Sequence, residues 1–335
     1  MEKHTELLAE KDSEVLQFES AVEAIISGDI SKLKSLLRKN PDLIRTRSTR
    51  QHRATLLHYV SANGVEAYRQ RTPKNAVEVA RMLLKAGAEV DADLTYRAAN
   101  VYPERKGSTP LGLAATSVHP AAAGVQLALL KLLLDWGASV DGIAGGWNPV
   151  IAALHNGRGD AASFLAKRGA QLDLESAAGT GRLDAVKSYF HRNGSLKTNA
   201  NQRQMELGFA WACEYGRTDV VAFLLQRGIV ATAQPHGETG LHWACYGGHA
   251  DIVRLLLKRN APLDIRDRRF GATPLGWALH GWCYPPLESK RNRYHEVVAL
   301  LLKAGARLDM AGLDSAQRKK LRRQDPRMRR ILNGS

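Results

Sequence analysis

Apolar and polar residues recur along this chain in the pattern of short amphipathic helices. The segment 250–258 is typical, because its apolar positions give a helix one wide buried face: Ile252, Val253, Leu255, Leu256 and Leu257. A glycine often follows such a segment, as Gly305 follows 297–303, and glycine is the usual residue just beyond a helix end. Thr273 before Pro274 supplies a helix start, since threonine caps the helix and proline suits its first turn. The pattern predicts short helices that come in pairs.

The helix pair belongs to a repeating unit. Two adjacent copies begin Thr239-Gly-Leu-His-Trp-Ala and Thr273-Pro-Leu-Gly-Trp-Ala, and each continues into an apolar helix. A closing motif of Gly or Asn, Ala, any residue, Leu or Val, and Asp recurs at 87–91, 137–141, 169–173, 260–264 and 305–309. One such unit cannot bury its own apolar face, so successive units must stack and share an extended core.

This repeat resembles the ankyrin family, whose T-P-L-H-x-A signature and period near 33 residues it matches closely. The resemblance covers about residues 20–310 and about eight repeats. It implies an all-α ankyrin-repeat solenoid in which each repeat has two helices and a short β-hairpin finger. Residues 57–70 and 109–120 resemble a bacterial variety of ankyrin protein, to which we attach no activity.

Departures from the repeat suggest a division of the chain. We expect an acidic N-terminal segment, an ankyrin-repeat domain and a basic C-terminal capping helix or tail, at 1–20, 21–312 and 313–335 respectively. The first repeat, near 21–44, lacks the T-P-L-H motif and is expected to cap the stack. The fifth repeat, near 174–193, has almost no finger. Extra residues interrupt other repeats near 65–74, 93–106, 119–124 and 283–293.

The chain has a formal net charge of +15, and its two most strongly basic segments lie at the ends of the repeats. Residues 32–53 carry eight basic residues and one acidic residue, and residues 313–335 carry eight basic and two acidic residues. The first 31 residues hold two basic and eight acidic residues. We therefore expect the acidic start to fold over the basic stretch that follows it, and the middle of the chain is only mildly basic.

Export, membrane insertion and disulfide formation are not expected. No apolar run reaches the roughly 18 residues of a membrane-spanning helix, and the N-terminus has no apolar signal core, which favours a cytoplasmic protein. Cys213 and Cys245 occupy equivalent places in successive repeats. Neighbouring helices lie about 8–10 Å apart, whereas a disulfide needs Cα atoms within about 7 Å. We therefore expect the cysteines to be free thiols. We also expect the protein to be a monomer.

The resemblance implies a binding groove on the face formed by the fingers and the first helices. The residues just before each helix-ending glycine should line it, with one nearby tryptophan: Asn63, Thr116, Ser117, His155, Asn156, Glu214, Tyr215, Tyr246, His280 and Trp282. Tyrosine and tryptophan commonly anchor protein interfaces. We therefore expect a scaffold for protein–protein interaction, with an acidic partner among the options. The alternative is a solvated helix edge without a partner.

Two further sets of residues recur at matching positions. Trp211, Trp243 and Trp277 align in three successive repeats. They could form a stripe for a ligand, but tryptophan is an ordinary ankyrin residue there, and we expect it to pack between repeats. His58 and His242 occupy the histidine position of the T-P-L-H motif, where the family uses histidine to tie neighbouring hairpins.

The insertions near 65–74 and 119–124 extend adjacent repeats at the same rim. Loops on a rigid scaffold often carry function, and these would form a lid over Asn63 and His155. The lid residues would be Tyr68, Arg69, Gln70, His119 and Gln126. A small-molecule-binding protein or an enzyme with a pocket under these insertions is therefore one alternative to the open groove.

No motif supports a particular reaction. The possible acid–base groups, Glu66, His119, His155 and Glu214, have no spacing that is diagnostic of a mechanism. The chain lacks G-x-S-x-G, H-E-x-x-H and a phosphate-binding glycine loop. We assign no catalytic residue, no metal and no cofactor. The basic ends leave a nucleic-acid-associated protein as a second alternative, although an acidic protein would use the same charge.

Overall fold

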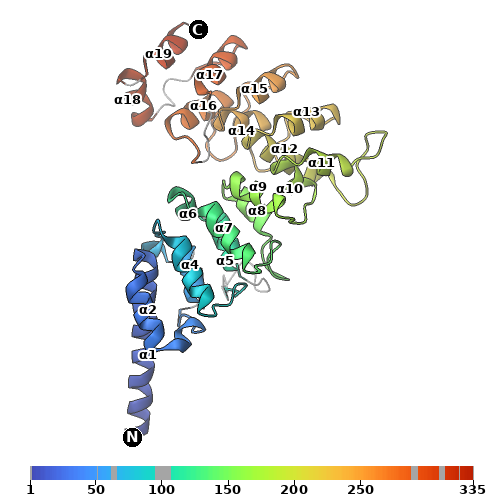
Figure 1. Cartoon of the computed structure of the whole chain (residues 1–335). Coiled ribbons are helices and arrows are strands. Elements are labelled where there is room, and N and C mark those ends of the chain that lie inside the picture. Colours follow the sequence, from blue (N-terminus) through green and yellow to red (C-terminus); the bar gives the residue numbers. More distant parts are fainter. Residues whose placement is uncertain are drawn as a thin grey trace. The chain divides into compact units, whose positions relative to one another are not determined.

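The computed structural model describes residues 2–50, 52–61, 66–94, 107–287, 293–308, 314–323 and 325–334, without the side chains of 2–12, 67 and 321–323. The chain divides into two compact units, Met1–Ala170 and Gln171–Ser335 (Figure 1). Across the described residues, regular secondary structure is entirely helical. The fingers contain isolated β-bridges at Arg47–Thr55 and Phe190–Leu196 rather than longer hairpin strands. The predicted all-α repeat fold is confirmed.

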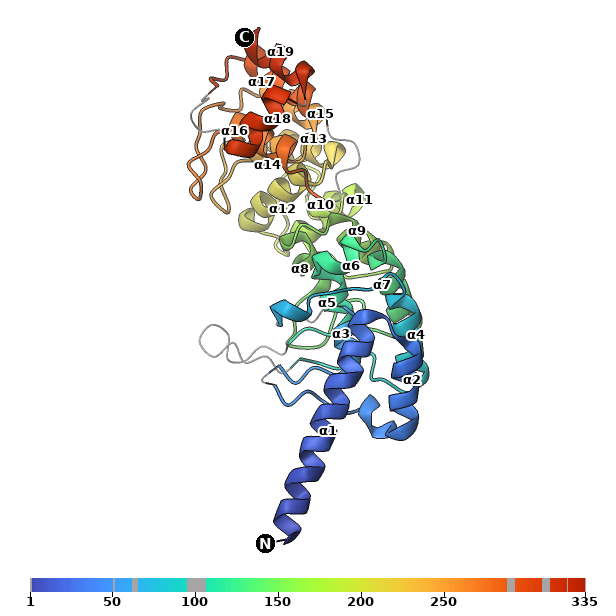
Figure 2. The same cartoon turned by 90° about the vertical axis from the view of Figure 1, so that its left-hand side faces the viewer.

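The N-terminal unit is built from four helix pairs. Its helices are α1 (Glu2–Ser27), α2 (Ile30–Lys39), α3 (Leu56–Val60), α4 (Ala76–Lys85), α5 (Pro110–Thr116), α6 (Val118–Ala122), α7 (Gln126–Asp135), α8 (Pro149–His155) and α9 (Gly159–Lys167), with short 3-10 turns at Pro41–Ile44 and Ala67–Arg69. The first helices α1, α3, α5 and α8 contact one another in order, and α4, α7 and α9 form the second layer. Helix α1 extends beyond the rest of this unit (Figure 2).

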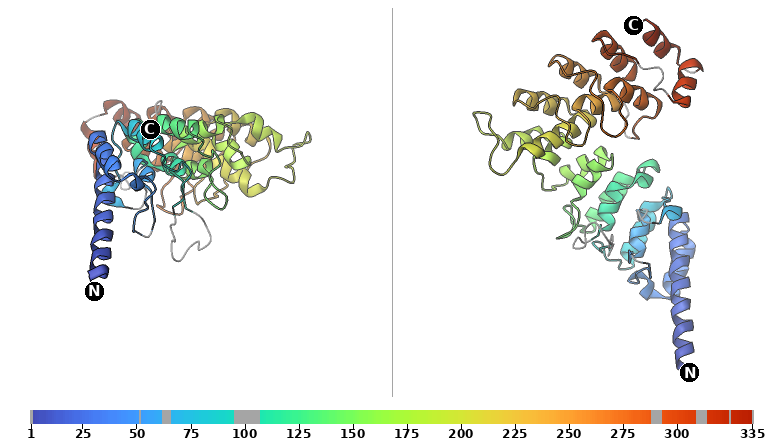
Figure 3. Two further views of the ribbon diagram at one scale, coloured as in Figure 1. Left: turned by 60° about the horizontal axis from the view of Figure 1, so that its bottom comes forward. Right: turned by 180° about the vertical axis from the view of Figure 1, so that it is seen from behind.

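Within the C-terminal unit, the helices are also arranged in two layers. Its helices are α10 (Leu174–Gly179), α11 (Leu183–Ser188), α12 (Gln202–Glu214), α13 (Thr218–Gln226), α14 (Gly240–Tyr246), α15 (Ala250–Leu257), α16 (Pro274–Cys283), α17 (Tyr294–Lys303), α18 (Ser315–Arg323) and α19 (Pro326–Asn333). Even-numbered helices from α10 to α18 contact in series, and so do odd-numbered helices from α11 to α19 (Figure 3). Their apolar faces share one core.

Side-chain caps explain where the first helices begin. Thr239 accepts a hydrogen bond from the His242 amide, while the His242 Nδ1 accepts one from the Thr239 amide at 3.2 Å. The Nε2 of His242 also lies 3.1 Å from the Ala272 carbonyl oxygen in the next finger. Burial lowers the pKa of His242, so its ring is neutral at pH 7 and joins one repeat to the next. At a helix end, Gly305 has a φ of +99°, which a side chain would strain.

The basic C-terminal segment forms a helix pair, α18 and α19, packed on α16 and α17. Met328 and Leu332 are buried in this contact. Asp325 accepts hydrogen bonds from the Trp282 indole (2.9 Å), from His295 Nε2 (2.8 Å) and from the Met328 amide (2.9 Å). The sequence suggested a single capping helix, but Asp325 and Pro326 stop α18 and start α19. The domain limits at residues 20 and 312 stay predictions.

A charge network joins α1 to the insertion that follows α3. Glu19 of α1 pairs with Arg50 (3.1 Å) and Arg69 (2.5 Å). The buried Glu66 pairs with Arg50 at 2.8 Å and lies 3.2 Å from His52 Nε2. The acidic first helix thus contacts the basic stretch that follows it, as its charge suggested. The other insertions differ, since 119–124 includes the end of α6, whereas 95–106 and 288–292 lie outside the described residues.

The structure also bears on the cysteines, on metal binding and on membrane-spanning helices. Cys213, Cys245 and Cys283 are free thiols, and burial raises the pKa of each. Within the described ranges, no group of three or more His, Cys, Asp and Glu residues could hold a metal ion. No helix in the described part of the chain combines the length and apolarity needed to cross a lipid bilayer.

Candidate binding groove

A continuous row of aromatic rings runs across three first helices of the C-terminal unit. Each helix contributes a tryptophan and, three or four residues later on the same face, a tyrosine or histidine. The members of this aromatic row are Trp211 of α12 and Tyr215 directly after it, Trp243 and Tyr246 of α14, and Trp277 and His280 of α16. Ring centroids are 6.3 Å apart for Trp211–Trp243, 5.0 Å for Trp243–Trp277 and 6.2 Å for Tyr246–His280.

The row becomes more exposed toward α16. Trp211 is 5% exposed and buried, whereas Trp243, Tyr246 and Trp277 are half-buried and His280 is exposed. Two exposed rings extend the row, because Phe270 lies 6.4 Å from Trp277 and Tyr284 lies 5.1 Å from His280. The rings from Trp243 onward therefore present a partly accessible aromatic surface.

Buried carboxylates hold two of the indoles in place. The Trp211 Nε1 donates to Glu175 at 2.9 Å, and the Trp277 Nε1 donates to Asp267 at 3.0 Å. The Trp243 Nε1 is also buried, but it has no hydrogen-bond partner among the described residues. The row is thus fixed at both ends by hydrogen bonds, with an unsatisfied donor at its centre.

Asp267 also organises the finger between α15 and α16. Its carboxylate accepts hydrogen bonds from the amides of Arg269 (2.8 Å), Phe270 (2.6 Å) and Ala272 (2.8 Å). Burial acts to raise the pKa of Asp267, but hydrogen bonds from the Phe270 amide and the Trp277 indole lower it below its usual value. Burial and the nearby Asp267 raise the pKa of Glu238. Asp267 therefore ties the finger to the aromatic row as an anion.

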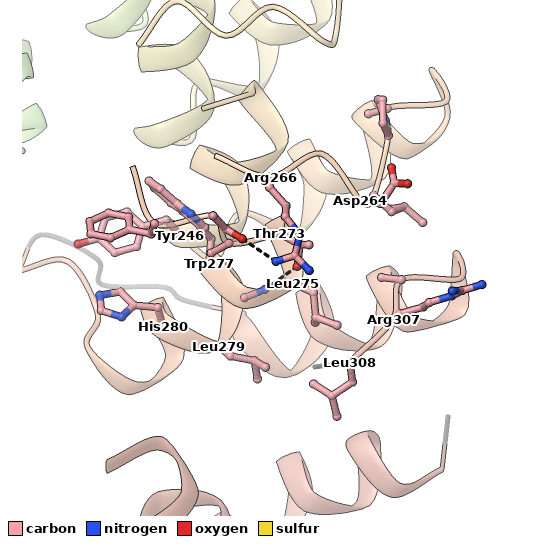
Figure 4. Close-up of a pocket in the computed structure, with 18 of the residues that line it drawn as sticks. Tyr246, Asp264, Arg266, Thr273, Leu275, Trp277, Leu279, His280, Arg307 and Leu308 are labelled. Atoms are coloured by element: carbon pink, nitrogen blue, oxygen red, sulfur yellow. Dashed lines mark hydrogen bonds between the residues drawn. The ribbon is translucent and has the colours of Figure 1, made fainter. Parts of the chain in front are cut away.

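The aromatic row and this finger line an open groove of about 1480 Å³. Figure 4 shows Tyr246, Trp277 and His280 on one side, Arg266 in the middle, and Arg307 and Leu308 on the far side. Pockets for small molecules usually measure roughly 300–1,000 Å³. The size and openness of this groove suit an extended polypeptide segment better than a single small ligand.

The structure places the predicted groove residues of the C-terminal unit in two different settings. Tyr246 and His280 line the groove, Tyr215 stacks on Trp211 at 6.3 Å, and Glu214 is half-buried at the same end of α12. Trp282 is 6% exposed, and the Lys320 ammonium lies 4.7 Å from the centre of its ring. Its indole hydrogen bond to Asp325 places it under the C-terminal helix pair, away from the row.

The predicted groove residues of the N-terminal unit lie at the ends of two adjacent helices. Thr116 ends α5 and bonds back to the Gly112 carbonyl oxygen (3.0 Å), and Ser117 caps α6. His155 and Asn156 are exposed at the end of α8, where Asn156 donates to the Ala152 carbonyl oxygen. Asn63 lies outside the described residues. Thr116 with Ser117 and His155 with Asn156 therefore lie at the C-terminal ends of the neighbouring helices α5 and α8.

The proposed lid residues have varied surroundings. Tyr68 is exposed, and His119 is half-buried in α6. Arg69 is buried and paired with acidic side chains of α1, and Gln70 donates to the Glu66 carbonyl oxygen. Gln126 is buried and donates to the Ala114 carbonyl oxygen at 2.9 Å. Arg69 and Gln126 thus support the unit itself, and a lid over Asn63 stays a prediction.

The sequence singled out the aligned tryptophans and favoured packing between repeats over a stripe for a ligand. Trp211 does pack in this way, whereas Trp243 and Trp277 also line the groove. The finger residues Arg266, Arg269 and Phe270 were not singled out. The available signal was the run Arg266-Asp-Arg-Arg-Phe270, in which a phenylalanine follows three arginines in a loop.

The stacked helix pairs, the fingers between them and the lined groove define a helical-repeat protein. A family model described as ankyrin repeats (3 copies) matches residues 174–267 and 209–311. Residues 174–311 therefore consist of ankyrin repeats, and ankyrin repeats generally act as scaffolds for protein–protein interaction. The human ASB11 ankyrin repeat domain is a similar solved structure, with 20% identity over 86% of this chain and 99% of that chain and a TM-score of 0.42. No curated protein matches the chain.

Proposed function

We propose that the C-terminal unit binds an extended segment of a partner protein in the groove beside the aromatic row. The observation that carries this proposal is the unbroken contact of rings from Trp211 to Tyr284 along three successive repeats, with its exposed end lining a groove of about 1480 Å³. Aromatic side chains bury a large area and lose little conformational freedom, which makes them common interface anchors. The general role of ankyrin repeats points the same way.

Tyr246 is the best single position at which to test the groove. It is half-buried, it contacts the rings of Trp243, Trp277 and His280, and it lines the groove. Its backbone carbonyl oxygen accepts the Tyr294 hydroxyl at 2.7 Å, and Tyr246→Ala keeps that contact. The substitution therefore removes binding surface while leaving this bond between repeats in place.

The experiment selects peptides from a displayed random library against the full chain and measures their dissociation constants. Tyr246→Ala should weaken the selected peptides by at least about 30-fold, or ~2 kcal/mol, as expected of an interface hot spot. Trp136→Ala is the matched control, because Trp136 is an exposed aromatic residue of the N-terminal unit, and it should leave affinity unchanged. Selected peptides that bind both variants as tightly as the wild type would refute the groove as the site.

A further inference from the structure

The finger beside the aromatic row carries a cluster of exposed arginines. Arg266, Arg268 and Arg269 lie in the finger, and Arg307 lies on the next one. Three of them, Arg266, Arg269 and Arg307, line the groove. Arg266 donates to the Gly271 carbonyl oxygen at 2.6 Å, and the Arg269 guanidinium lies 5.0 Å from the centre of the Phe270 ring. Among the described residues, none of the four forms an ion pair with a carboxylate.

Two arginines of the second layer in the same repeats, Arg254 and Arg293, are paired, whereas the exposed Arg259 beyond the end of α15 has no ion pair with a described carboxylate. Arg254 of α15 contacts Asp251 at 2.7 Å and also Glu296, and Arg293 contacts Asp251 at 2.8 Å. The second-layer helices thus neutralise their arginines internally. The groove-lining arginines keep their charge open to solvent.

Nearby acidic groups do not neutralise the finger. Asp267 and Glu238 are buried, and neither lines the groove; the Asp267 carboxylate accepts hydrogen bonds from the finger amides and the Trp277 indole. Asp314 caps α18 by accepting the Gln317 amide at 2.8 Å. Asp264 is exposed and lies with Arg307 on the far side of the groove from the aromatic rings (Figure 4). The groove lining thus holds three arginines against two acidic side chains, Asp264 and Asp314, and Arg266 and Arg269 lie on the finger beside the aromatic row.

The finger is also held in one conformation. Its three amides bond to Asp267, and the Arg268 amide donates to the Gly237 carbonyl oxygen at 3.2 Å. The Arg268 side chain packs over Gly237, since a Cβ at Gly237 would lie 3.1 Å from it. A loop that is ordered before binding loses little conformational entropy on binding, so more of its interaction energy with the partner appears as affinity.

We infer that this finger and the aromatic row bind an Asp- and Glu-rich segment of the partner protein. The inference rests on the proposed function and specifies the chemical class of the segment that the groove binds. Guanidinium groups pair with carboxylates through two parallel hydrogen bonds, and the partner's apolar side chains would lie on Trp277 and Tyr246. The ring geometry favours a peptide over single-stranded nucleic acid, because the rings meet edge to face at 77° and 81°. In such packing the rings are not parallel, so Trp243, Tyr246 and Trp277 do not offer a set of aligned faces on which successive bases would stack.

The test measures fluorescence anisotropy with a labelled dodecapeptide, Asp-Glu-Phe repeated four times. The matched neutral probe is Asn-Gln-Phe repeated four times, and a labelled single-stranded 12-nucleotide DNA is the third probe. The acidic peptide should bind at least tenfold more tightly than the neutral peptide, and its affinity should fall as salt is raised.

Two pairs of charge reversals identify the site. Arg266→Glu with Arg269→Glu should weaken the acidic peptide at least tenfold. Arg192→Glu with Arg203→Glu is the control, because it makes the same change in net charge at exposed positions of the same unit outside the groove. Arg266→Gln with Arg269→Gln provides a milder variant in case the charge reversals perturb folding, which thermal unfolding reports.

Equal binding of the acidic and neutral peptides would overturn the inference, and so would equal losses from the finger and control reversals. Tighter binding of the DNA, with the same dependence on Arg266 and Arg269, would replace it with a nucleic-acid site. Library peptides that depend on Tyr246 but not on the finger arginines would leave the proposed function standing and refute this inference alone. Acidic peptides that depend on the arginines but not on Tyr246 would refute the aromatic groove instead.

Discussion

At the scale of single residues, the indole nitrogens of the C-terminal unit have unequal surroundings. Trp211, Trp277 and Trp282 donate to carboxylates of Glu175, Asp267 and Asp325. Trp243 lies between Trp211 and Trp277, yet its buried Nε1 has no acceptor within the described part of the chain. A buried donor without a partner costs about 1–3 kcal/mol, whereas a hydrogen bond to a charged group contributes about 1.5–3 kcal/mol.

This difference predicts that two matched substitutions change stability by different amounts. Trp277→Phe should lower the free energy of unfolding by about 1.5–3 kcal/mol, because Asp267 loses a charge-assisted hydrogen bond. Trp243→Phe should change it by less than about 1 kcal/mol, because relief of the unpaired N–H offsets the lost ring contacts. Urea denaturation of the full chain measures both values. A loss at Trp243 as large as that at Trp277 would contradict this account of the row.

Asp267 gives a pH-dependent prediction. Its pKa in the folded protein lies below the ordinary value of 3.8, so its ionised form contributes stability above that value and loses it as pH falls through the lower folded pKa. The stability difference between the wild type and Asp267→Asn should therefore be largest near neutral pH and shrink below about pH 4. Both proteins are compared in a Glu238→Gln background, which removes the neighbouring carboxyl. A difference that stays constant down to pH 3 would refute the anionic role of Asp267.

At the scale of elements, the C-terminal helix pair covers the last repeat. Asp325 caps α19 and accepts hydrogen bonds from Trp282 of α16 and His295 of α17. Burial acts to raise the pKa of Asp325, but these hydrogen bonds lower it. One carboxylate thus connects three helices, and the apolar residues Met328 and Leu332 complete the contact.

Removing that carboxylate should loosen the end of the stack. Asp325→Ala is expected to lower the free energy of unfolding by about 1–3 kcal/mol, because a helix cap and the hydrogen bonds from the buried Trp282 and the half-buried His295 are lost. Arg327→Ala, at an exposed position of α19, should have little effect. Thermal and urea unfolding of the two variants measure this, and groove-binding peptides should bind both equally. Equal stability of the two variants would show that the helix pair does not cap the repeats through Asp325.

The sequence predicts helices better than it predicts exposure. Thr-Pro starts, glycine ends and apolar faces are local signals, and they correctly placed α14 to α17. Whether Trp243 and Trp277 are covered depends instead on rings and fingers that come from other repeats. The second C-terminal helix had a local signal in Asp325-Pro326 that was not used. The fixed shape of the finger depends on Asp267 reaching amides two, three and five residues away, which no periodicity reveals.

At the scale of the whole molecule, the two units use their charges differently. In the N-terminal unit, acidic residues of α1 pair with Arg50 and Arg69 and so hold an insertion in place. In the C-terminal unit, Arg266, Arg269 and Arg307 remain unpaired with described carboxylates beside the aromatic row. The matched family model also lies in the C-terminal unit, over residues 174–311. We therefore propose that the partner binds the C-terminal unit, in the groove rather than through the basic segments 32–53 and 313–335.

The most direct test of this assignment is a hydrogen-exchange footprint of the full chain with and without a peptide selected from the displayed library. Binding in the groove should slow amide exchange in residues 240–247 of α14 and in residues 266–284 of the finger and α16. Exchange in 110–156 of the N-terminal unit should not change. Protection confined to 110–156, where the lid and pocket alternative would place the ligand, would contradict the account.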